Sequence, residues 1–262
     1  MVDMREFPAT SLGDGVTLPM VGFGTWSLYG QQAYDAVRCA LDAGYRHIDT
    51  ASVYKNEAEV GHAVRDSGLD RRDVFLTTKL PAGADIRDRA TIGDSLRALG
   101  STYVDLLLIH WPPDGRASPA VWEDLLTIRD RGLARAVGVS NYSPGQIDEL
   151  TRATGEAPAV DQIPWSPRRY DPALLSALRE RGVAVEGYSP LKDTDLGATA
   201  LAEIAARHGV TPAQVVLRWH LEHQITIIPK SAHPDRIVSN FALSGFALSA
   251  DEMSRLDGLA AG

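Results

Sequence analysis

The sequence has only one cysteine, Cys39, among 262 residues. A single thiol excludes an intramolecular disulfide and any cysteine-rich metal site. Long apolar runs are also missing, because the most apolar segment, residues 104–109, is interrupted by Asp105 and is far too short to span a bilayer. Residues 1–11 lack the basic start and apolar core of a secretory signal. We therefore expect a cytoplasmic protein with no membrane partner.

An excess of positive charge is likewise missing. The chain has 26 Lys and Arg against 34 Asp and Glu, which gives a formal net charge of −8. This balance argues against a nucleic-acid partner. The seven histidines show no metal-ligand spacing, so we expect no metal site. With 44% hydrophobic and 23% charged residues, the remaining composition is that of an ordinary globular protein.

Short β-branched runs alternate with longer helical runs after an opening hairpin over residues 9–20. The expected strands cover residues 20–23, 45–49, 73–79, 104–109, 135–139, 157–163, 183–187 and 225–228. The expected helices cover residues 31–43, 57–67, 86–99, 119–131, 144–151, 172–180, 198–208 and 212–222, then a segment from about 234 and residues 251–259. About eight β-then-α units are typical of a closed parallel barrel or a doubly wound sheet.

Two observations favour the barrel. A doubly wound dinucleotide-binding fold needs a Gly-x-Gly-x-x-Gly turn that opens a helix after its first strand. Residues 22–26 have no third glycine, and no helix begins there at once. Eight units also suit closure, since one α/β barrel takes roughly 250 residues. We therefore predict an α/β protein with a (β/α)₈ TIM barrel, an N-terminal β-hairpin and a short C-terminal helical segment, forming a single domain over residues 1–262.

Polar residues follow the carboxyl ends of these strands, which is the end where barrels place their chemistry. They are Gly24, Thr25 and Trp26; Asp49, Thr50 and Ala51; Lys79; His110 and Trp111; Ser140 and Asn141; Gln162; Tyr188 and Ser189; and Lys230 and Ser231. Strands often end in Ser, Asn or Asp simply because the loops that follow them are exposed to solvent. That explanation accounts less well for a lysine, a histidine and a tyrosine-bearing loop on consecutive strands. The pattern indicates a functional site at this rim.

Several segments at and around these strand ends resemble the aldo-keto reductase superfamily. The matching segments are residues 44–51, Tyr54, and residues 57–61, 77–80, 107–111, 138–142 and 228–231. They run through the chain in the family's order and approximate spacing, and the bacterial diketogluconate and methylglyoxal reductases are the most similar branch. The resemblance implies a catalytic tetrad of Asp49, Tyr54, Lys79 and His110. It also implies NADPH-dependent reduction of aldehydes and ketones.

The chemistry of these residues gives a mechanism. A tyrosine with an ordinary pKa near 10 is neutral at pH 7 and can donate a proton. We expect Lys79, kept charged by Asp49, to lower the pKa of Tyr54 toward the working range. A neutral His110 would hydrogen-bond the substrate oxygen, which Tyr54 protonates as hydride arrives from the nicotinamide. Two structural alternatives stay open. Asp49 and Lys79 could be a buried ion pair that only fills the barrel, and His110 could be a core histidine whose hydrogen bonds are all made within the protein.

Cations cluster where the last strand gives way to a helix, although a helix N-terminus disfavours positive charge. They are Lys230, Arg236 and His233, and Ser231 is the expected helix cap. A bound phosphate resolves the conflict, because helix N-termini bind anions and barrels often place phosphates after strands seven and eight. The resemblance identifies this group as the 2′-phosphate of NADPH, with NADH as a weaker alternative.

The resemblance also supplies the remaining contacts. The expected cofactor contacts are Gly24, Thr25, Trp26, Ser140, Asn141, Gln162, Tyr188, Ser189, Pro190, Leu191, Asp195, Ser239 and Asn240, where Ser239 replaces a common acidic residue. Among these, Ser140, Asn141 and Gln162 would bind the carboxamide, and Tyr188 would stack on the nicotinamide ring. The substrate is expected among Trp26, Tyr54, His110 and Trp111. Short loops there predict an open site for small aldehydes, 2-dicarbonyls or keto-sugars.

Two other functions remain open at this point. A cofactor-binding barrel could serve as a redox sensor or regulatory subunit, although a pure binder has no need of a paired Lys79 and Tyr54. A Schiff-base lyase could use the amine of Lys79 as its nucleophile. Borohydride trapping of substrate on Lys79 would favour the lyase, whereas NADPH oxidation by an aldehyde favours the reductase. We expect the protein to be a monomer.

Overall fold

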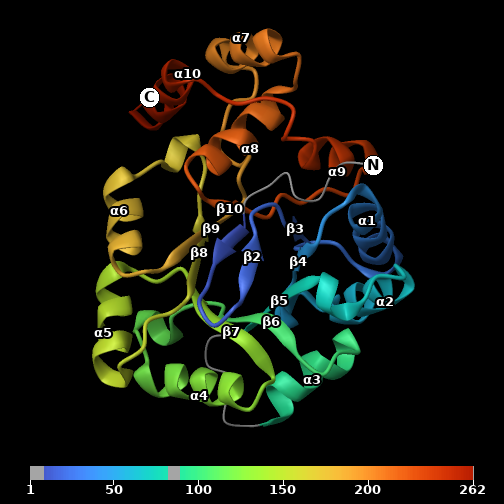
Figure 1. Ribbon diagram of the computed structural model, residues 1–262, viewed down its shortest axis with the longest axis vertical. Helices are drawn as coiled ribbons and strands as arrows, with labels where there is room; N and C mark the ends of the chain where they lie inside the picture. The colour runs from blue at the N-terminus through green and yellow to red at the C-terminus, as the bar shows by residue number, and fades with distance from the viewer. Residues whose placement is uncertain (1–8, 82–88, 262) are drawn as a thin grey trace.

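The computed structural model describes residues 9–81 and 89–261, and its centre is an eight-stranded parallel sheet (Figure 1). The strands are β3 (Phe23–Gly24), β4 (His47–Asp49), β5 (Phe75–Leu80), β6 (Val104–Ile109), β7 (Ala134–Ser140), β8 (Val160–Pro164), β9 (Ala184–Tyr188) and β10 (Thr226–Ile227). Each strand pairs with its neighbours in chain order from β3 to β10. This order confirms the predicted barrel and excludes a doubly wound sheet.

Helices surround the sheet, and every expected helix has a counterpart in the described part of the chain (Figure 1). They are α1 (Gly30–Ala43), α2 (Glu57–Asp66), α3 (Arg89–Leu99), α4 (Pro119–Asp130), α5 (Pro144–Thr154), α6 (Pro172–Glu180), α7 (Thr199–His208), α8 (Pro212–Glu222), α9 (Pro234–Phe241) and α10 (Ala250–Asp257). The first residues of the helix expected over 86–99 lie outside the described residues. No described helix is both long and apolar enough to cross a membrane.

Local sequence signals explain where several of these helices begin. Capping boxes start α5 at Ser143 and α8 at Thr211, and each is followed by a proline in the first turn. The hydroxyl accepts a backbone N–H of the first turn while the glutamine three residues later bonds back, so two exposed donors are satisfied. A third capping box, at Ser249, starts α10, which is the predicted C-terminal helical segment.

The two edges of the sheet meet through glycine-rich backbone. The N–H of Gly22 donates to the carbonyl of Ile227 at 2.7 Å, and the N–H of Ile227 donates to Met20 at 2.9 Å. A Cβ on Gly24 would lie 2.7 Å from the carbonyl oxygen of Ile228, so a larger residue would separate the edges. These glycines therefore serve barrel closure.

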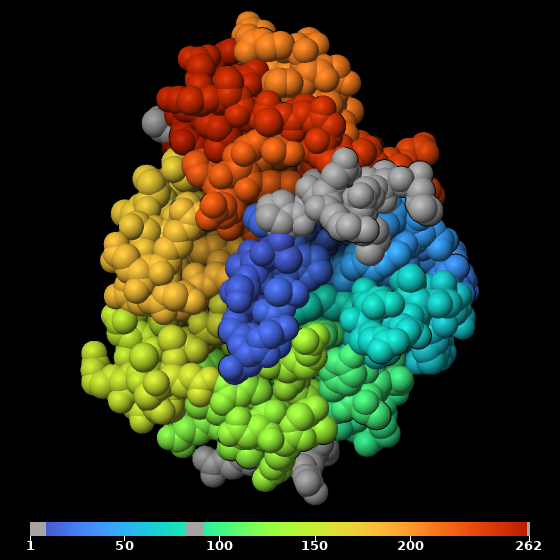
Figure 2. All heavy atoms as spheres, in the orientation of Figure 1, coloured from blue at the N-terminus to red at the C-terminus, as the bar shows by residue number. Residues whose placement is uncertain are grey.

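The N-terminal hairpin closes the end of the barrel at which the strands begin, opposite their carboxyl ends. Strands β1 (Ala9–Ser11) and β2 (Thr17–Pro19) pair antiparallel, as predicted. Val16 and Leu18 are buried against apolar residues near the starts of the barrel strands, including Phe75 and Val160. Figure 2 shows the hairpin atoms, in blue, filling this face between the surrounding helices. The hairpin covers this end, so the carboxyl ends of the strands are left to carry the site.

Candidate active site

A buried ion pair lies at the carboxyl ends of β4 and β5. The ammonium of Lys79 donates to both carboxylate oxygens of Asp49, at 2.6 and 2.7 Å, and to the carbonyl of Thr50 at 3.0 Å. Lys79 is fully buried and Asp49 is 2% exposed. Burial alone would lower the pKa of Lys79, but Asp49 and Tyr54 together raise it above its ordinary value. The amine is therefore a cation held in place by Asp49 and Thr50.

Tyr54 lies directly beside this pair. It ends the short helix η1 (Ser52–Tyr54), and its ring centroid is 5.2 Å from the Lys79 nitrogen. Burial raises the pKa of Tyr54, and this effect outweighs Lys79, which lowers it by charge and by a hydrogen bond. The contribution of Lys79 has the predicted sign. The predicted net lowering of the tyrosine pKa is wrong for this structure, because the sequence does not reveal how deeply the phenol is buried.

His110 faces the same space from the end of β6. Its ring meets the ring of Tyr54 edge-on, with centroids 5.7 Å apart. Burial first, and the Lys79 cation second, lower the pKa of His110 to about 4. The imidazole is therefore neutral at physiological pH and can donate one hydrogen bond. The four residues expected to form the tetrad lie together.

A cavity of about 720 Å³ opens above these residues at the mouth of the barrel. Of the predicted site residues, the cavity is lined by Gly24, Trp26, Asp49, Tyr54, His110, Trp111, Ser140, Asn141, Gln162, Tyr188, Ser189, Pro190, Leu191 and Lys230. Five further residues line the cavity without having been predicted, namely Tyr29, Val53, Lys192, Ile228 and Pro229. They lie beside predicted positions on the same loops, so proximity in sequence was the available signal.

Hydrogen bonds connect three strand ends across the cavity wall. The hydroxyl of Tyr188 donates to Oδ1 of Asn141 at 2.9 Å, and Nδ2 of Asn141 donates to the hydroxyl of Ser140 and the carbonyl of His110. Asn141 has a φ of 66°, a left-handed conformation that a non-glycine residue adopts at a cost. The surrounding bonds hold this side chain in one orientation. The wall is therefore ordered by the chain's own residues.

The sequence profile of the aldo/keto reductase family matches residues 20–261. The chain belongs to this family. It is 41% identical over 264 residues to 2,5-diketo-D-gluconic acid reductase B from Corynebacterium sp., and the match covers 99% of this chain and 95% of the relative. The crystal structure of an aldo/keto reductase from Brucella melitensis superimposes with a TM-score of 0.91 at 36% identity, covering 97% of this chain and 99% of that one. The protein is thus an oxidoreductase that acts on small carbonyl compounds.

A Bombyx mori aldo-keto reductase, solved in complex with NADP, is also similar to this reductase. The TM-score is 0.88 at 32% identity, and the match covers 97% of this chain and 92% of that chain. Aldo/keto reductases typically use a nicotinamide cofactor.

Several predicted cofactor residues lie outside the cavity of the reductase. They are Thr25, Asp195, Ser231, His233, Arg236, Ser239 and Asn240. Thr25 is buried with its hydroxyl on the carbonyl of Asp49, and Asp195 accepts the N–H of Gly197 within its own loop. The predicted cap of α9 is wrong, because His233 is the N-cap residue and Ser231 accepts the N–H of His233 at 3.0 Å. Ser231 stabilises the turn that precedes the helix.

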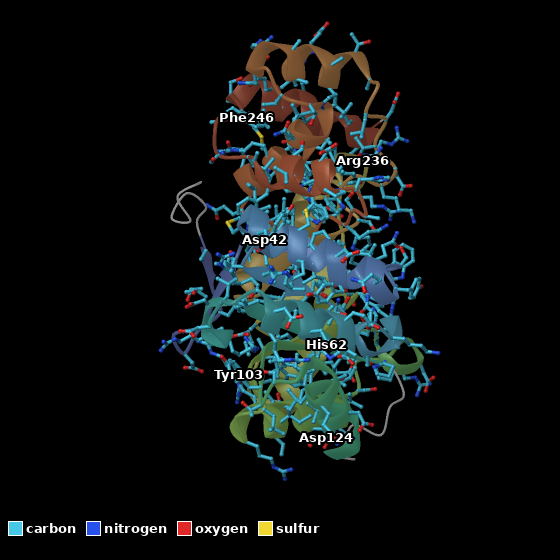
Figure 3. All side chains as sticks on the ribbon, turned by 90° about the vertical axis from the view of Figure 1, so that its right-hand side faces the viewer. Asp42, His62, Tyr103, Asp124, Arg236 and Phe246 are labelled. Carbon is cyan, nitrogen blue, oxygen red and sulfur yellow. The ribbon has the colours of Figure 1, made fainter. Side chains whose placement is uncertain are left out.

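The three predicted phosphate ligands spread outward from the cavity. Lys230 lines it, whereas His233 and Arg236 are exposed at the start of α9. Figure 3 shows Arg236 at the outside of the molecule. This row of basic residues passes from the mouth of the cavity to the surface.

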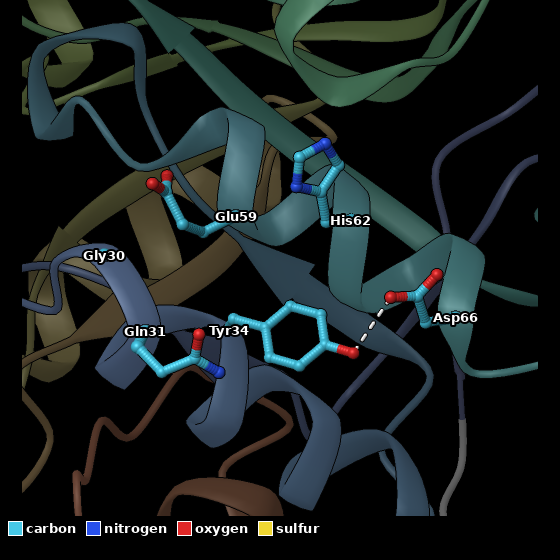
Figure 4. Close-up of a pocket in the computed structure, with 6 residues that line it drawn as sticks. All are labelled: Gly30, Gln31, Tyr34, Glu59, His62 and Asp66. Carbon is cyan, nitrogen blue, oxygen red and sulfur yellow. Dashed lines mark hydrogen bonds between the residues drawn. The ribbon is translucent and has the colours of Figure 1, made fainter.

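A second hollow lies between the outer faces of α1 and α2, apart from the tetrad residues (Figure 4). Its lining includes Tyr34, whose hydroxyl donates to Asp66 at 2.9 Å, and His62. Among the described residues, no three His, Cys, Asp or Glu side chains are grouped so that they could hold a metal ion.

Two buried polar residues below the tetrad were not predicted as site residues, Glu186 on β9 and His47 on β4. The signal for Glu186 was an acidic residue in an otherwise apolar strand. His47 lies two residues before Asp49, on a strand that is buried throughout.

Proposed function

We propose that this reductase converts aldehydes and ketones to alcohols with NADPH, and that Tyr54 donates the proton to the carbonyl oxygen. The observation that carries the proposal is the Lys79 cation, held by both oxygens of Asp49 and placed beside the phenol of Tyr54. A cation there stabilises the phenolate that proton donation leaves behind. The phenol and the neutral His110 imidazole line one cavity, so both can hydrogen-bond a single carbonyl oxygen.

The protonation states favour reduction. Tyr54 has a pKa above its ordinary value, so it holds its proton at neutral pH. His110 is neutral and does not compete as a stronger acid. The cofactor supplies hydride to the carbonyl carbon, and the protein supplies the proton and the position of the substrate.

The residues present fit a nicotinamide cofactor with a 2′-phosphate. The amide of Asn141 and the hydroxyl of Ser140 lie at the cavity wall, where they can hold a carboxamide, and Tyr188 offers a ring for stacking. Nε2 of Gln162 is committed to carboxylates, which leaves its carbonyl oxygen as the acceptor for the same carboxamide. Lys230, with His233 and Arg236 beyond it, would hold the phosphate.

Replacing Arg236 with Ala is expected to weaken NADPH binding by about 1–3 kcal/mol, the size of one charge-assisted hydrogen bond. NADH affinity should barely change, because NADH lacks the 2′-phosphate. Titration calorimetry with both cofactors measures the difference, and Arg152→Ala, an exposed arginine on α5, is the matched control. Equal losses for the two cofactors would show that Arg236 does not contact the 2′-phosphate.

The open mouth suits a range of small carbonyl compounds. Trp26 and Trp111 line the cavity while remaining 63% and 51% exposed, so their rings can cover a substrate without enclosing it. We propose small aldehydes, 2-dicarbonyls or keto-sugars as substrates, in keeping with the diketogluconate reductase among the relatives. A panel of these compounds, followed by the loss of NADPH absorbance, tests the function. A barrel that only senses cofactor would bind NADPH and oxidise none of it.

The lyase alternative requires a neutral, accessible Lys79 amine. Here three acceptors engage the ammonium, the residue is fully buried, and its pKa is raised. These contacts favour a lysine that acts through its positive charge over one that acts as a nucleophile. Borohydride in the presence of a carbonyl substrate should therefore leave Lys79 unmodified.

A further inference from the structure

Glu186 lies inside the barrel below the ion pair and has no assigned role. It is fully buried, and its Oε2 accepts a hydrogen bond from Nε2 of Gln162 at 3.1 Å. The same nitrogen donates to Oδ2 of Asp49 at 2.8 Å. One amide group therefore joins two carboxyl groups, and both of its protons are used.

The other oxygen of Glu186 faces His47. Nδ1 of His47 lies 3.3 Å from the carbonyl oxygen of Pro19, which can only accept, so this nitrogen must carry a proton. Burial, with a smaller effect from Lys79, lowers the pKa of His47 to about 3, although the bond to Pro19 opposes this. The ring is therefore neutral, and its Nε2 is a lone-pair acceptor. This Nε2 lies 3.1 Å from Oγ1 of Thr77 and 3.5 Å from Oε1 of Glu186.

An ionised Glu186 would leave two acceptors facing each other in a site without solvent. Its Oε1 has no hydrogen-bond partner among the described residues, which is costly for a buried charged oxygen. A proton on Oε1 removes the buried charge, and an O–H then faces Nε2 of His47 in place of a second bare acceptor. At 3.5 Å this is a contact and not a full hydrogen bond, because the Thr77 hydroxyl lies nearer to the same lone pair. We propose that Glu186 is a protonated carboxylic acid in the working reductase and positions Gln162 and Asp49 beneath Tyr54 and Lys79. This inference rests on the proposed function of Tyr54.

The charges around Glu186 support the neutral form. The groups that face it are His47 and Asp49 from β4, Thr77 and Lys79 from β5, Gln162 from β8, and Tyr54 from η1. Lys79 and Asp49 already cancel, so a second carboxylate would leave the interior with net negative charge. Burial first, and the Asp49 charge second, raise the pKa of Glu186 to about 8.

Ionisation of Glu186 would weaken the proposed acid. Its negative charge is one of the effects that raise the pKa of Tyr54. As pH rises through about 8, Glu186 loses its proton and the phenol becomes a poorer donor. Part of the alkaline fall in activity should therefore come from Glu186.

The test is Glu186→Gln, whose amide can keep both contacts of the protonated acid. We expect its kcat at pH 7 to stay within about threefold of wild type and its alkaline fall to move to higher pH. Glu186→Ala leaves Gln162 unsupported and should lose about tenfold or more. The control is Glu57→Gln, which removes another buried carboxyl, bonded to the Thr78 hydroxyl at 2.6 Å, and should leave the pH profile of kcat unchanged.

Two further readouts do not depend on turnover. A carboxyl whose pKa is raised from 4.5 to about 8 on folding contributes stability that is lost as pH rises through this range. The Tm of Glu186→Gln relative to wild type should therefore increase from pH 4.5 to about 8 and then level off. In infrared difference spectra at neutral pH, the wild type should show the carbonyl band of a protonated acid that Glu186→Gln lacks.

Opposite results would overturn the proposal. They are a loss of about 100-fold in kcat for Glu186→Gln at pH 7, a Tm difference that does not change with pH, or the absence of the protonated-acid band. Each would indicate an ionised Glu186 paired with a charged His47. If Glu186→Gln does not fold, carbon-13 NMR of glutamate-labelled wild type decides the same point, with Glu57→Gln used to assign the other buried carboxyl. Should Tyr54→Phe keep its turnover, the proposed function fails while these spectra still decide the state of Glu186.

Discussion

Tyr54→Phe is expected to lower kcat for aldehyde reduction by roughly 10²–10⁴-fold, the usual contribution of a positioned general acid. The phenyl ring keeps the packing of Tyr54 against His110, where the centroids are 5.7 Å apart, and loses only the hydroxyl. Cofactor affinity should therefore remain that of the wild type. Steady-state kinetics with one aldehyde, together with calorimetry for NADPH, separates the two effects.

The matched control for this change is Tyr103→Phe. Tyr103 lies outside the cavity, where the Arg71 guanidinium stacks over its ring at 4.3 Å from the centroid. Removing its hydroxyl should leave kcat unaltered. If Tyr54→Phe itself retained a rate within about threefold of wild type, Tyr54 would not be the proton donor.

The sequence predicted the order of elements well, and the reasons are local. Strand β6 and helix α6 have the predicted bounds. Strand β6 is a nearly continuous apolar run, and α6 is capped by Asp171, whose side chain accepts two backbone N–H groups of the first turn. Strand β4 starts later than predicted. The N–H of Tyr45 donates a hydrogen bond to the carbonyl of Ala40 at the end of α1. Tyr45 therefore belongs to the C-terminal cap of the helix and does not pair in the sheet.

The depth of the site could not be predicted in the same way. Polar residues at strand ends were visible in the sequence, because the barrel brings all such ends to one rim. The contacts of Glu186 were not visible, since Gln162 lies 24 positions away and its other partner, Asp49, lies 113 positions from Gln162. The burial that raises the pKa of Tyr54 likewise comes from the assembled barrel. A local sequence pattern contains neither the distances between residues far apart in the chain nor the burial of a side chain in the folded barrel.

Lys79→Met is expected to have the largest effect on stability. The substitution leaves the carboxylate of Asp49 buried without its cation, and removing one partner of a buried ion pair costs about 3–5 kcal/mol. Reduction should also slow by about 100-fold or more, because the charge that lowers the pKa of Tyr54 is lost. Urea unfolding and steady-state kinetics measure the two losses on the same protein.

The double variant Lys79→Met with Asp49→Asn separates structure from catalysis. In the wild type Gln162 donates a hydrogen bond to Asp49, and the neutral amide of Asp49→Asn can still accept it. No unpaired charge is then buried, so most of the lost stability should return. The rate should not return, since no cation then lies beside Tyr54 to stabilise its phenolate. A double variant that regained both stability and rate would mean that the ion pair only fills the barrel. A variant that regains stability alone assigns the Lys79 charge to the proton transfer and the Asp49 carboxylate to keeping that charge in place.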